Sequence, residues 1–350
     1  MIQLDGSLGE GGGAILRQAL ALSTLTKKPF EIKNIRKGRP TPGLKAQHMH
    51  SIIALEKISG CNTVGCELGS DTITFIPGDI KNKHIKVDVG TAGSITLLLQ
   101  SLILPIIFSG KKVIIELTGG TDVKWSQPID HFTNVFVPHL KKYAEIEVNT
   151  MNRGYYPKGG GKIILKIKSN TEQLEDLKEI QLTKRGELLQ IRGISHASAD
   201  LESAMVAYKQ LKNADVHLAH LKVPINIRME YSKTPSTGAG ICIWGLFGID
   251  GEYDFIRPVI IGVDSLGERE KKSEAVGKEA AEKFLKEYET NTVVDKYTAD
   301  QLIPVLAVTG GQMLVSKITN HLHSNIYVCE KFLPVKFEIS ENLVTAKKLS

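Results

Sequence analysis

Apolar positions along the chain follow two spacings, one typical of helices and one typical of strands. Ile15, Leu16, Ala19, Leu22 and Leu25 recur three and four residues apart and predict a helix over residues 11–26. Short runs of branched residues around it predict strands. The chain begins in the order strand, helix, strand, helix, strand, strand, over residues 2–4, 11–26, 30–35, 44–58, 61–64 and 72–76.

The same order of elements recurs along the chain, which predicts repeated structural units. A second unit has strands at 85–89, 112–117, 146–150 and 162–167 and helices at 94–108 and 129–143. A third unit starts with a strand at 179–183 and resumes with helices at 298–308 and 324–332 and strands at 312–318, 335–340 and 343–347. Because a long stretch of sequence separates the first strand of this unit from its next element, we expect an insertion between residues 183 and 298.

The insertion has its own pattern of elements. Its predicted strands cover 188–194, 225–231, 240–247 and 259–263, and its predicted helices cover 200–213 and 273–288. Strands that alternate with helices indicate a layered α/β fold. We predict that residues 1–184 and 291–350 form a large domain of three β-α-β-α-β-β units, and that 185–290 form a smaller β-α-β-β-β-α domain.

Composition excludes several classes of protein. The 350 residues are 42 % hydrophobic and 23 % charged, as in globular proteins rather than fibrous or disordered ones. The four cysteines show no CxxC spacing, so neither structural zinc nor a disulfide framework is expected. The start of the chain shows no secretory signal, and the apolar stretch 95–108 is too short and mixed to span a bilayer. We therefore expect a cytoplasmic protein without membrane contacts.

Glycine clusters fall between predicted strands and helices. The segments 6–13 (GSLGEGGG) and 90–93 (GTAG) each precede a predicted helix, where backbone N–H groups and the helix dipole favour anions. Tight turns alone would also require glycine there. Glu10 lies within the first cluster, and a carboxylate beside a phosphate site could hold Mg²⁺.

Basic residues form a second candidate site. Arg17 lies on the first predicted helix, and Arg36 and Arg39 follow the second strand in the segment IRKGRP, with Gln47 shortly after. The guanidinium group is suited to bidentate contacts with phosphate. A solvated basic loop is the alternative, and the formal charge of +6 permits an anionic partner without requiring one.

Two further segments carry groups suited to nucleotide chemistry. In DKYTADQ (295–301), Tyr297 could stack on a base, while a helix cap with a packed tyrosine is the alternative. In HLHSN (321–325), His321 and His323 precede the predicted helix at 324–332. Histidine can act as a nucleophile or acid–base group near neutral pH, although a lone loop histidine is more often structural.

Together these segments resemble the RNA 3'-terminal phosphate cyclase family. The matching stretches occur in the family's order and cover nearly the whole chain outside the insertion: LDGSLGEGGGAILRQALALS, IRKGRPTPGLKAQH, GTAGSITLLLQ, GGTD, RGYYPKGGGK, YTADQL and HLHSNIYVCEKFLPVKF. The resemblance implies repeated β-α-β-α-β-β units with an inserted thioredoxin-like domain. It also implies an ATP-dependent reaction with Mg²⁺ or Mn²⁺ on RNA that ends in a 3'-phosphate.

The resemblance further implies roles for individual residues. His321 matches the nucleophile that carries AMP, with Ser324 in place of the threonine of the family's H-x-x-T-N pattern. Glu10 matches the metal-side acid. The matches to the ATP pocket are Gln100, Pro128, Tyr297, Asp300 and Gln301, with Tyr297 and Pro128 on the two faces of adenine. The matches to phosphate and RNA-end contacts are Arg17, Arg36, Arg39 and Gln47.

Two other functions remain as alternatives. Non-catalytic relatives that act in ribosome assembly share the fold but lack the nucleophilic histidine, whereas this chain has His321. Enolpyruvyl transferases also use repeated β-α-β-α-β-β units, but that function leaves the segments YTADQ and HLHSN without a role. The sequence makes no prediction of the oligomeric state.

Overall fold

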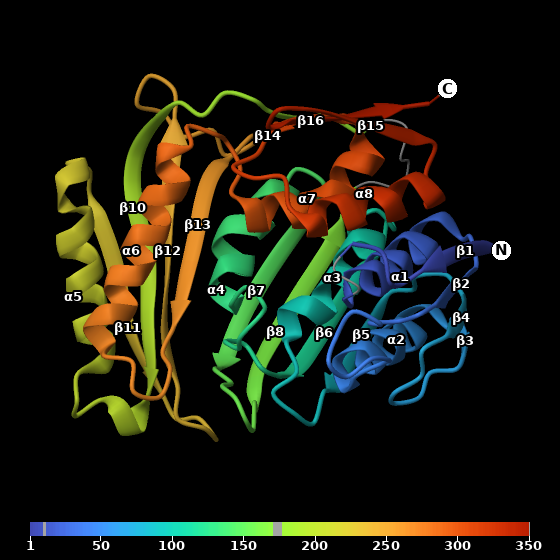
Figure 1. Ribbon diagram of the computed structural model, residues 1–350, viewed down its shortest axis with the longest axis horizontal. Helices are drawn as coiled ribbons and strands as arrows, with labels where there is room; N and C mark the ends of the chain where they lie inside the picture. Colours follow the sequence, from blue (N-terminus) through green and yellow to red (C-terminus); the bar gives the residue numbers. More distant parts are fainter. Residues whose placement is uncertain (10–11, 171–176, 350) are drawn as a thin grey trace.

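The computed structural model describes residues 1–9, 12–170 and 177–349, and its mixed α/β architecture confirms the expected fold class. Figure 1 shows one four-stranded sheet with two long helices at one side of the molecule and three further sheets with their helices at the other. The N-terminus and the C-terminus both lie on the side away from that first sheet.

Three of the four sheets have the same strand order and the same strand directions. In each, two neighbouring strands are parallel and the remaining neighbours are antiparallel. The orders are β1 (Ile2–Asp5), β2 (Phe30–Lys33), β4 (Ile73–Ile76), β3 (Asn62–Val64); β5 (Lys83–Asp88), β6 (Lys112–Gly119), β8 (Gly161–Ser169), β7 (Ala144–Asn152); and β9 (Ile180–Leu182), β14 (Gly311–Leu314), β16 (Leu343–Lys348), β15 (Val335–Ser340).

Helices connect the strands of these sheets because a parallel pair needs a crossover. The crossover helices are α1 (Ala14–Thr26), α3 (Ile95–Ile107) and α7 (Lys296–Thr309), and α2 (Ala46–Ser59) and α8 (Asn320–Phe332) follow the second strand of the first and third sheets. Apolar side chains from all three sheets and their helices form one continuous core, which includes Phe30, Leu99 and Phe332.

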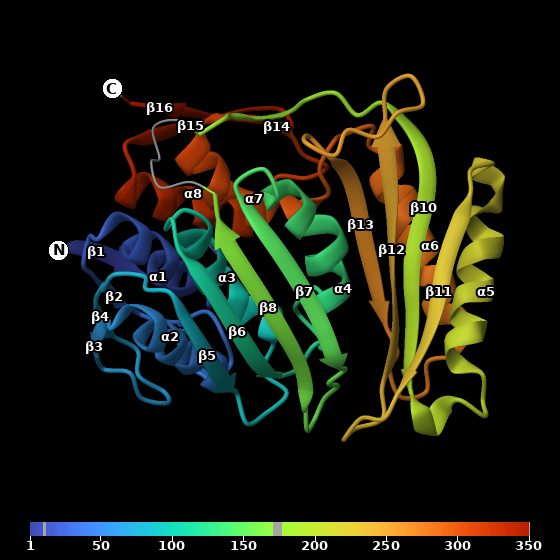
Figure 2. The ribbon, with the colours of Figure 1, turned by 180° about the vertical axis from the view of Figure 1, so that it is seen from behind.

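The inserted segment forms the fourth sheet. Its strand order is β11 (Ile225–Ser232), β10 (Glu187–Ser198), β12 (Ala239–Gly248), β13 (Val259–Leu266). Helices α5 (Val206–Leu218) and α6 (Ser273–Glu289) cover one face, where Phe284 and Val276 belong to a separate apolar cluster (Figures 1 and 2). The other face packs on Val135 of the second unit. Gly262 permits this approach, because a Cβ there would lie 2.4 Å from a methyl carbon of Val135.

Several predicted elements differ from the structure. The helix expected over 129–143 is a short α4 (Ile129–His131) followed by a π-helix (Phe132–Phe136) and a 3-10 turn (Val137–Leu140). Pro138 lies in that turn and cannot donate the hydrogen bond that an α-helix needs. The helix expected over 200–213 is also interrupted, because Met205 adopts a left-handed backbone with φ 53° before α5 begins.

The prediction that His321 and His323 precede a helix is wrong. Helix α8 starts at Asn320, because Thr319 accepts the backbone N–H of Leu322 at 2.9 Å and caps the helix. The preceding strand β14 is correspondingly shorter than the expected 312–318. Both histidines therefore lie in the first turn of α8.

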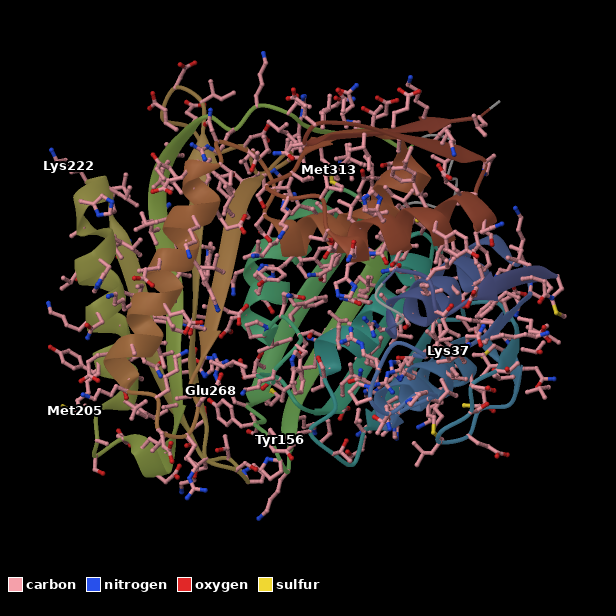
Figure 3. All side chains as sticks on the ribbon, in the orientation of Figure 1. Lys37, Tyr156, Met205, Lys222, Glu268 and Met313 are labelled. Atoms are coloured by element: carbon pink, nitrogen blue, oxygen red, sulfur yellow. The ribbon has the colours of Figure 1, made fainter. Side chains whose placement is uncertain are left out.

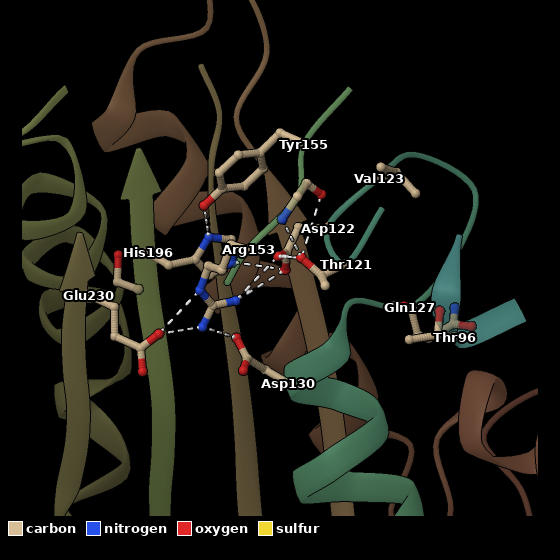
Figure 4. A network of polar contacts seen from close by, with 12 residues as sticks. Thr96, Thr121, Asp122, Val123, Gln127, Asp130, Arg153, Tyr155, His196 and Glu230 are labelled. Atoms are coloured by element: carbon tan, nitrogen blue, oxygen red, sulfur yellow. Dashed lines mark hydrogen bonds and ion pairs between the residues drawn. The ribbon is translucent and has the colours of Figure 1, made fainter. Parts of the chain in front are cut away.

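A buried ionic network joins the inserted sheet to the second unit (Figure 4). Arg153 follows β7 and contacts Asp122 at 3.3 Å, Asp130 at 2.9 Å and Glu230 at 2.6 Å. Burial alone would lower the pKa of Arg153, but these carboxylates raise it, so the guanidinium stays charged. Glu230 is on β11, so the network crosses between the two parts of the fold.

His196 and Tyr155 extend this network. His196 Nε2 lies 3.3 Å from Asp122, and its Nδ1 lies 2.8 Å from the hydroxyl of Tyr155. Burial is the main reason that the pKa of His196 falls to about 4, so the ring is neutral near pH 7. The carboxylate beside Nε2 places the ring proton there, and Nδ1 accepts from Tyr155.

Within the described parts of the chain, no helix combines the length and the apolar composition needed to cross a bilayer. The domain boundaries at 184/185 and 290/291 stay a prediction.

Candidate active site

A large cleft lies between the repeated units and the inserted sheet. Its volume is about 1770 Å³, beyond the roughly 300–1,000 Å³ of an ordinary small-molecule pocket. Nine of the eleven residues singled out in the sequence line it: Arg17, Arg36, Arg39, Gln47, Gln100, Tyr297, Asp300, Gln301 and His321. Residues far apart in the chain therefore meet around one cavity, which has room for more than one substrate.

Five helices direct their N-termini into this cleft. Each contributes residues of its cap or first turn to the lining: Ala14 of α1, Gln47 of α2, Ser94 before α3, Lys296 of α7 and His321 of α8. A helix N-terminus carries partial positive charge and unpaired backbone N–H groups. The convergence of five of them favours a polyanion.

Arginines add to this positive field. Arg17 is almost completely buried, and its Nε donates to the amide oxygen of Gln100 at 2.9 Å. Burial, and then the charges of Arg39 and Arg36, lower the pKa of Arg17 to about 10. Arg36 donates to the carbonyls of Thr41 and Gly43, at 2.7 and 3.0 Å. The repulsion among these cations would be relieved by a bound phosphate.

His48 is a site residue to which the sequence analysis assigned no role, although it ends the motif IRKGRPTPGLKAQH. Its Nδ1 accepts the backbone N–H of Lys45 at 3.1 Å, which leaves the proton on Nε2. That Nε2 is buried in the cleft wall and has no hydrogen-bond partner among the described residues. Burial, followed by the charge of Arg17, lowers the pKa of His48 to about 3. A neutral ring with an unused N–H donor beside the arginines fits an anion. Its position next to Gln47 was the available sequence signal.

Contacts between α7 and α8 fix the position of His321. Thr319, the cap of α8, donates to the carboxylate of Asp300 at 2.5 Å, and Asn325 donates to the backbone carbonyl of Asp300 at 2.7 Å. His321 is half-buried and lines the cleft, whereas His323 is exposed and does not. The two histidines therefore differ in access to any bound substrate.

The N-terminal glycine loop packs against the first turn of α8. Gly9 has φ 62°, and a Cβ there would lie 2.1 Å from Ser324 Oγ. Gly13 makes a similar close approach, because its Cβ would lie 2.2 Å from His48 Nε2 and 2.8 Å from an Arg17 nitrogen. Glycine is required at both positions by these contacts, beyond the needs of a tight turn.

Tyr297 is held at the start of α7. Asp295 caps the helix and accepts the backbone N–H groups of Tyr297 and Thr298, at 3.0 and 2.9 Å. The ring of His131 meets the Tyr297 ring edge-on at 6.4 Å, and the ammonium of Lys296 lies 4.9 Å from its centroid. The structure confirms the helix cap, with Asp295 as the capping residue. Tyr297 lines the cleft, and its stacking on a base stays a prediction.

Two predicted site residues are not placed in the lining. Pro128 is buried as the cap of α4, and the neighbouring Ser126 and Gln127 line the cleft instead. Glu10 lies outside the described residues. The structure does bring one potential set of metal ligands together, Asp122, Asp130 and His196. Arg153 already forms ion pairs with both aspartates, so a metal ion would have to compete with its guanidinium for these carboxylates.

Comparison with known proteins identifies the family. A family model described as RNA 3'-terminal phosphate cyclase matches residues 8–339. RNA 3'-terminal phosphate cyclase of Pyrococcus abyssi (strain GE5 / Orsay) is 43 % identical over 340 residues, which cover 97 % of this chain and 95 % of that protein. The chain belongs to the RNA 3'-terminal phosphate cyclase family.

Other members of this cyclase family match over the same span. The proteins of that name from Saccharolobus solfataricus (strain ATCC 35092 / DSM 1617 / JCM 11322 / P2) and Archaeoglobus fulgidus (strain ATCC 49558 / DSM 4304 / JCM 9628 / NBRC 100126 / VC-16) are 41 % and 40 % identical over 343 residues. Each match covers 97 % of this chain, and 96 % and 98 % of the relatives. The family match includes every site residue predicted from the sequence, from Glu10 to His321.

Buried histidines predict how the stability of this cyclase-family chain depends on pH. Burial lowers the pKa of His48 to about 3 and those of His139 and His196 to about 4, so these rings take up protons only on unfolding. The contribution of these neutral rings to the free energy of unfolding is complete above pH 6.5, and it is lost as the pH falls towards their pKa values in the folded protein. Burial raises the pKa of Asp130 to about 6, so this group releases up to one proton on unfolding. This release offsets part of the uptake by the histidines.

The expected net result is an uptake of protons on unfolding between about pH 5 and 6, so stability should fall as the pH is lowered through this range. Burial also raises the pKa values of Asp264 and Glu287, which reduces the uptake. Urea unfolding measured across this range tests it. His48→Gln should reduce the number of protons taken up on unfolding by about one, and the pH dependence of stability should become less steep. A wild-type profile without slope would contradict the assignment of neutral buried rings.

Proposed function

We propose that the chain converts an RNA 3'-terminal phosphate to a 2',3'-cyclic phosphodiester in a reaction that consumes ATP. The observation that carries this proposal is the meeting of His321, three arginines and five helix N-termini in one cleft. A nucleophile beside a polyanion site suits nucleotidyl transfer. The names of the relatives support the substrate class.

The proposed reaction has three steps. A ring nitrogen of His321 attacks the α-phosphorus of ATP and a P–N bond forms. The bond between the α-phosphorus and the α,β-bridging oxygen breaks, and that oxygen leaves with pyrophosphate. An oxygen of the RNA 3'-phosphate then attacks this phosphorus, the P–N bond breaks, and the AMP is transferred to the RNA end. Finally the 2'-hydroxyl loses its proton, its oxygen attacks the 3'-phosphorus, and AMP leaves. A poor leaving group is thereby exchanged for a good one.

The cleft residues have distinct proposed roles. Arg17, Arg36 and Arg39 hold phosphates, with the unused Nε2–H of His48 as a further donor. Gln100 orients Arg17 through their hydrogen bond, and Gln47 lies beside them at the N-termini of α2 and α3. Asp300 and Gln301 form the wall next to Tyr297. A Mg²⁺ or Mn²⁺ ion would neutralise phosphate charge, with Glu10 as its candidate ligand.

Tyr297 is the proposed stacking partner of adenine. Tyr297→Ala should weaken the use of ATP roughly ten- to a hundredfold, by analogy with about 1–3 kcal/mol per stacked base. Tyr297→Phe keeps the ring and should stay close to wild type. The KM for ATP at saturating RNA measures the effect. Equal KM values for the alanine variant and wild type would assign the adenine to another surface. Pro128 is buried and does not line the cleft, so its place on the second face of adenine stays a prediction.

A direct experiment tests the whole proposal. The protein is incubated with ATP and Mg²⁺ or Mn²⁺ and its intact mass is measured, with and without RNA that ends in a 3'-phosphate. We expect an increase by one AMP that disappears when RNA is added, together with an RNA end that resists phosphatase. A non-catalytic assembly factor would give neither result, and binding of phosphoenolpyruvate without ATP would favour an enolpyruvyl transferase.

The proposed reaction also bears on location. ATP is its cosubstrate, and the four cysteines are unpaired thiols, as is usual in a reducing compartment. We therefore propose that the protein acts in the cytoplasm.

A further inference from the structure

An exposed tryptophan stands at the rim of the cleft, outside every role proposed above. Trp125 lies on the loop between β6 and α4, its side chain is 92 % exposed, and it lines the cleft. Its φ of 65° is a left-handed conformation that a bulky residue rarely adopts. The other tryptophan, Trp244, is buried. A large ring displayed to solvent at the mouth of a cleft, on a strained backbone, points to a ligand.

The loop that presents Trp125 is held at both ends (Figure 4). Val123 is almost completely buried, and its carbonyl accepts the hydroxyl of Ser126 at 3.1 Å. The carbonyl of Gln127 accepts the hydroxyl of Thr96 at 2.7 Å. Lys124 reaches across to Glu268, after β13, at 2.8 Å. The ring is therefore displayed by a loop that is anchored on both sides of the cleft.

A second exposed ring lines the same cleft from the next loop. Tyr156 is 77 % exposed and lies between β7 and β8, at the lower edge of the molecule in Figure 3. The following residues pack on the inserted segment: the N–H of Lys158 donates to Ser236 at 3.0 Å, and a Cβ on Gly160 would lie 2.7 Å from Pro235. Loops of the inserted segment thus support both aromatic loops.

Charge distinguishes between possible occupants of this rim. Among the described residues that line the cleft, eight are Lys or Arg and four are Asp or Glu. The aromatic rim is continuous with the phosphate-binding wall, since both belong to the same cavity. Exposed aromatic rings beside cationic groups are the usual platform for single-stranded nucleic acid, because every base has a face that can stack. A protein partner would find the same rings but would not need the excess of cations.

We propose that Trp125 stacks on a base of single-stranded RNA upstream of the 3'-terminal nucleotide, with Tyr156 as a second stacking surface. This inference rests on the proposed function, because it takes the RNA end to be held at the arginines. It also gives the inserted segment a role in binding RNA, since the loops of that segment hold the two rings in place at the cleft mouth.

Tryptophan fluorescence tests the proposal without turnover. The chain has two tryptophans, one exposed and one buried, so RNA that stacks on Trp125 should quench the exposed emission. The probe is a single-stranded oligoribonucleotide that ends in a 3'-phosphate. The quenching should disappear in Trp125→Phe, which retains only Trp244. Persistence of the full quenching in that variant would overturn the proposal.

Kinetics provides the second measurement. Trp125→Ala should raise the KM for the oligoribonucleotide roughly five- to a hundredfold, at unchanged kcat, and Trp125→Phe should recover most of the loss. A nucleoside 3'-phosphate has no upstream base, so its KM should not change. Phe255→Ala is the control, since Phe255 is 82 % exposed but does not line the cleft. Transfer of AMP to the protein should be unaffected in all of these variants.

The two proposals fail in different ways. If wild type forms no AMP adduct and cyclises no RNA but its fluorescence is still quenched through Trp125, the catalytic proposal is wrong and the stacking site stands. If wild type cyclises RNA while Trp125→Ala keeps the wild-type KM, or raises the KM of the nucleoside substrate equally, the stacking site is wrong and the catalytic proposal stands.

Discussion

Replacing His321 with alanine is expected to abolish the transfer of AMP from ATP to the protein. The side chain is half-buried in the first turn of α8, lines the cleft, and lies among the helix N-termini that would hold the triphosphate. Loss of a covalent nucleophile removes the reaction path, and in a well-studied protease it costs about 10⁶ in turnover. Intact mass after incubation with ATP and Mg²⁺ or Mn²⁺ measures the adduct.

His323→Ala is the matched control for this experiment. His323 lies two residues further along the same helix turn, but it is exposed and does not line the cleft. Its alanine variant should form the adduct as wild type does. Thr319 still caps α8 in both variants, so the helix should be retained. An adduct on the His321→Ala protein, or its absence from His323→Ala alone, would assign the nucleophile to another residue.

The largest effect on stability is expected from Arg153→Met. Arg153 is the cation between Asp122, Asp130 and Glu230, and its removal leaves buried carboxylates without a counter-charge. Breaking such a buried pair costs about 3–5 kcal/mol. Because the network joins the inserted sheet to the second unit, the loss should also loosen that junction (Figure 4). Chemical unfolding at pH 7 measures the change.

Arg228→Met is the control for Arg153→Met. Arg228 contacts the same Glu230 at 2.9 Å, but its side chain is 69 % exposed, so its removal should cost at most about 1 kcal/mol. Low pH provides a second test. Without Arg153 the pKa values of Asp122 and Asp130 should rise, so both groups should become protonated below about pH 5. The difference in free energy of unfolding between wild type and Arg153→Met should therefore become smaller there. Equal stability of the two variants would show that the network contributes little.

Local sequence patterns predicted most of the elements because they depend on short-range spacing. The helix over 11–26 and the strands around it follow from apolar periodicity, and the structure has α1 at Ala14–Thr26. The pattern did not predict the π-helix and 3-10 turn that replace the helix expected over 129–143. Apolar spacing alone does not distinguish these backbones from an α-helix, and Pro138 removes a backbone donor without changing that spacing.

The candidate site was predicted residue by residue, but its shape was not. Motifs identified Arg17, Tyr297 and His321, which the structure brings to one cleft. No role was predicted for His48 or Trp125, although His48 ends the motif IRKGRPTPGLKAQH, because the sequence does not show which side chains are buried and which are exposed. Burial distinguishes them: the Nε2 of His48 is enclosed beside the arginines, and the ring of Trp125 is displayed at the rim.

The sequence by itself determined the order of most elements and the types of chemistry available in each loop. These features depend on spacing and side-chain identity within a few residues. Only the tertiary structure decided that five helix N-termini converge, that Arg153 contacts three carboxylates from separate segments, and that loops of the inserted segment support Trp125 and Tyr156. These arrangements depend on contacts between residues that are distant in the chain, and such contacts leave no local pattern in one sequence.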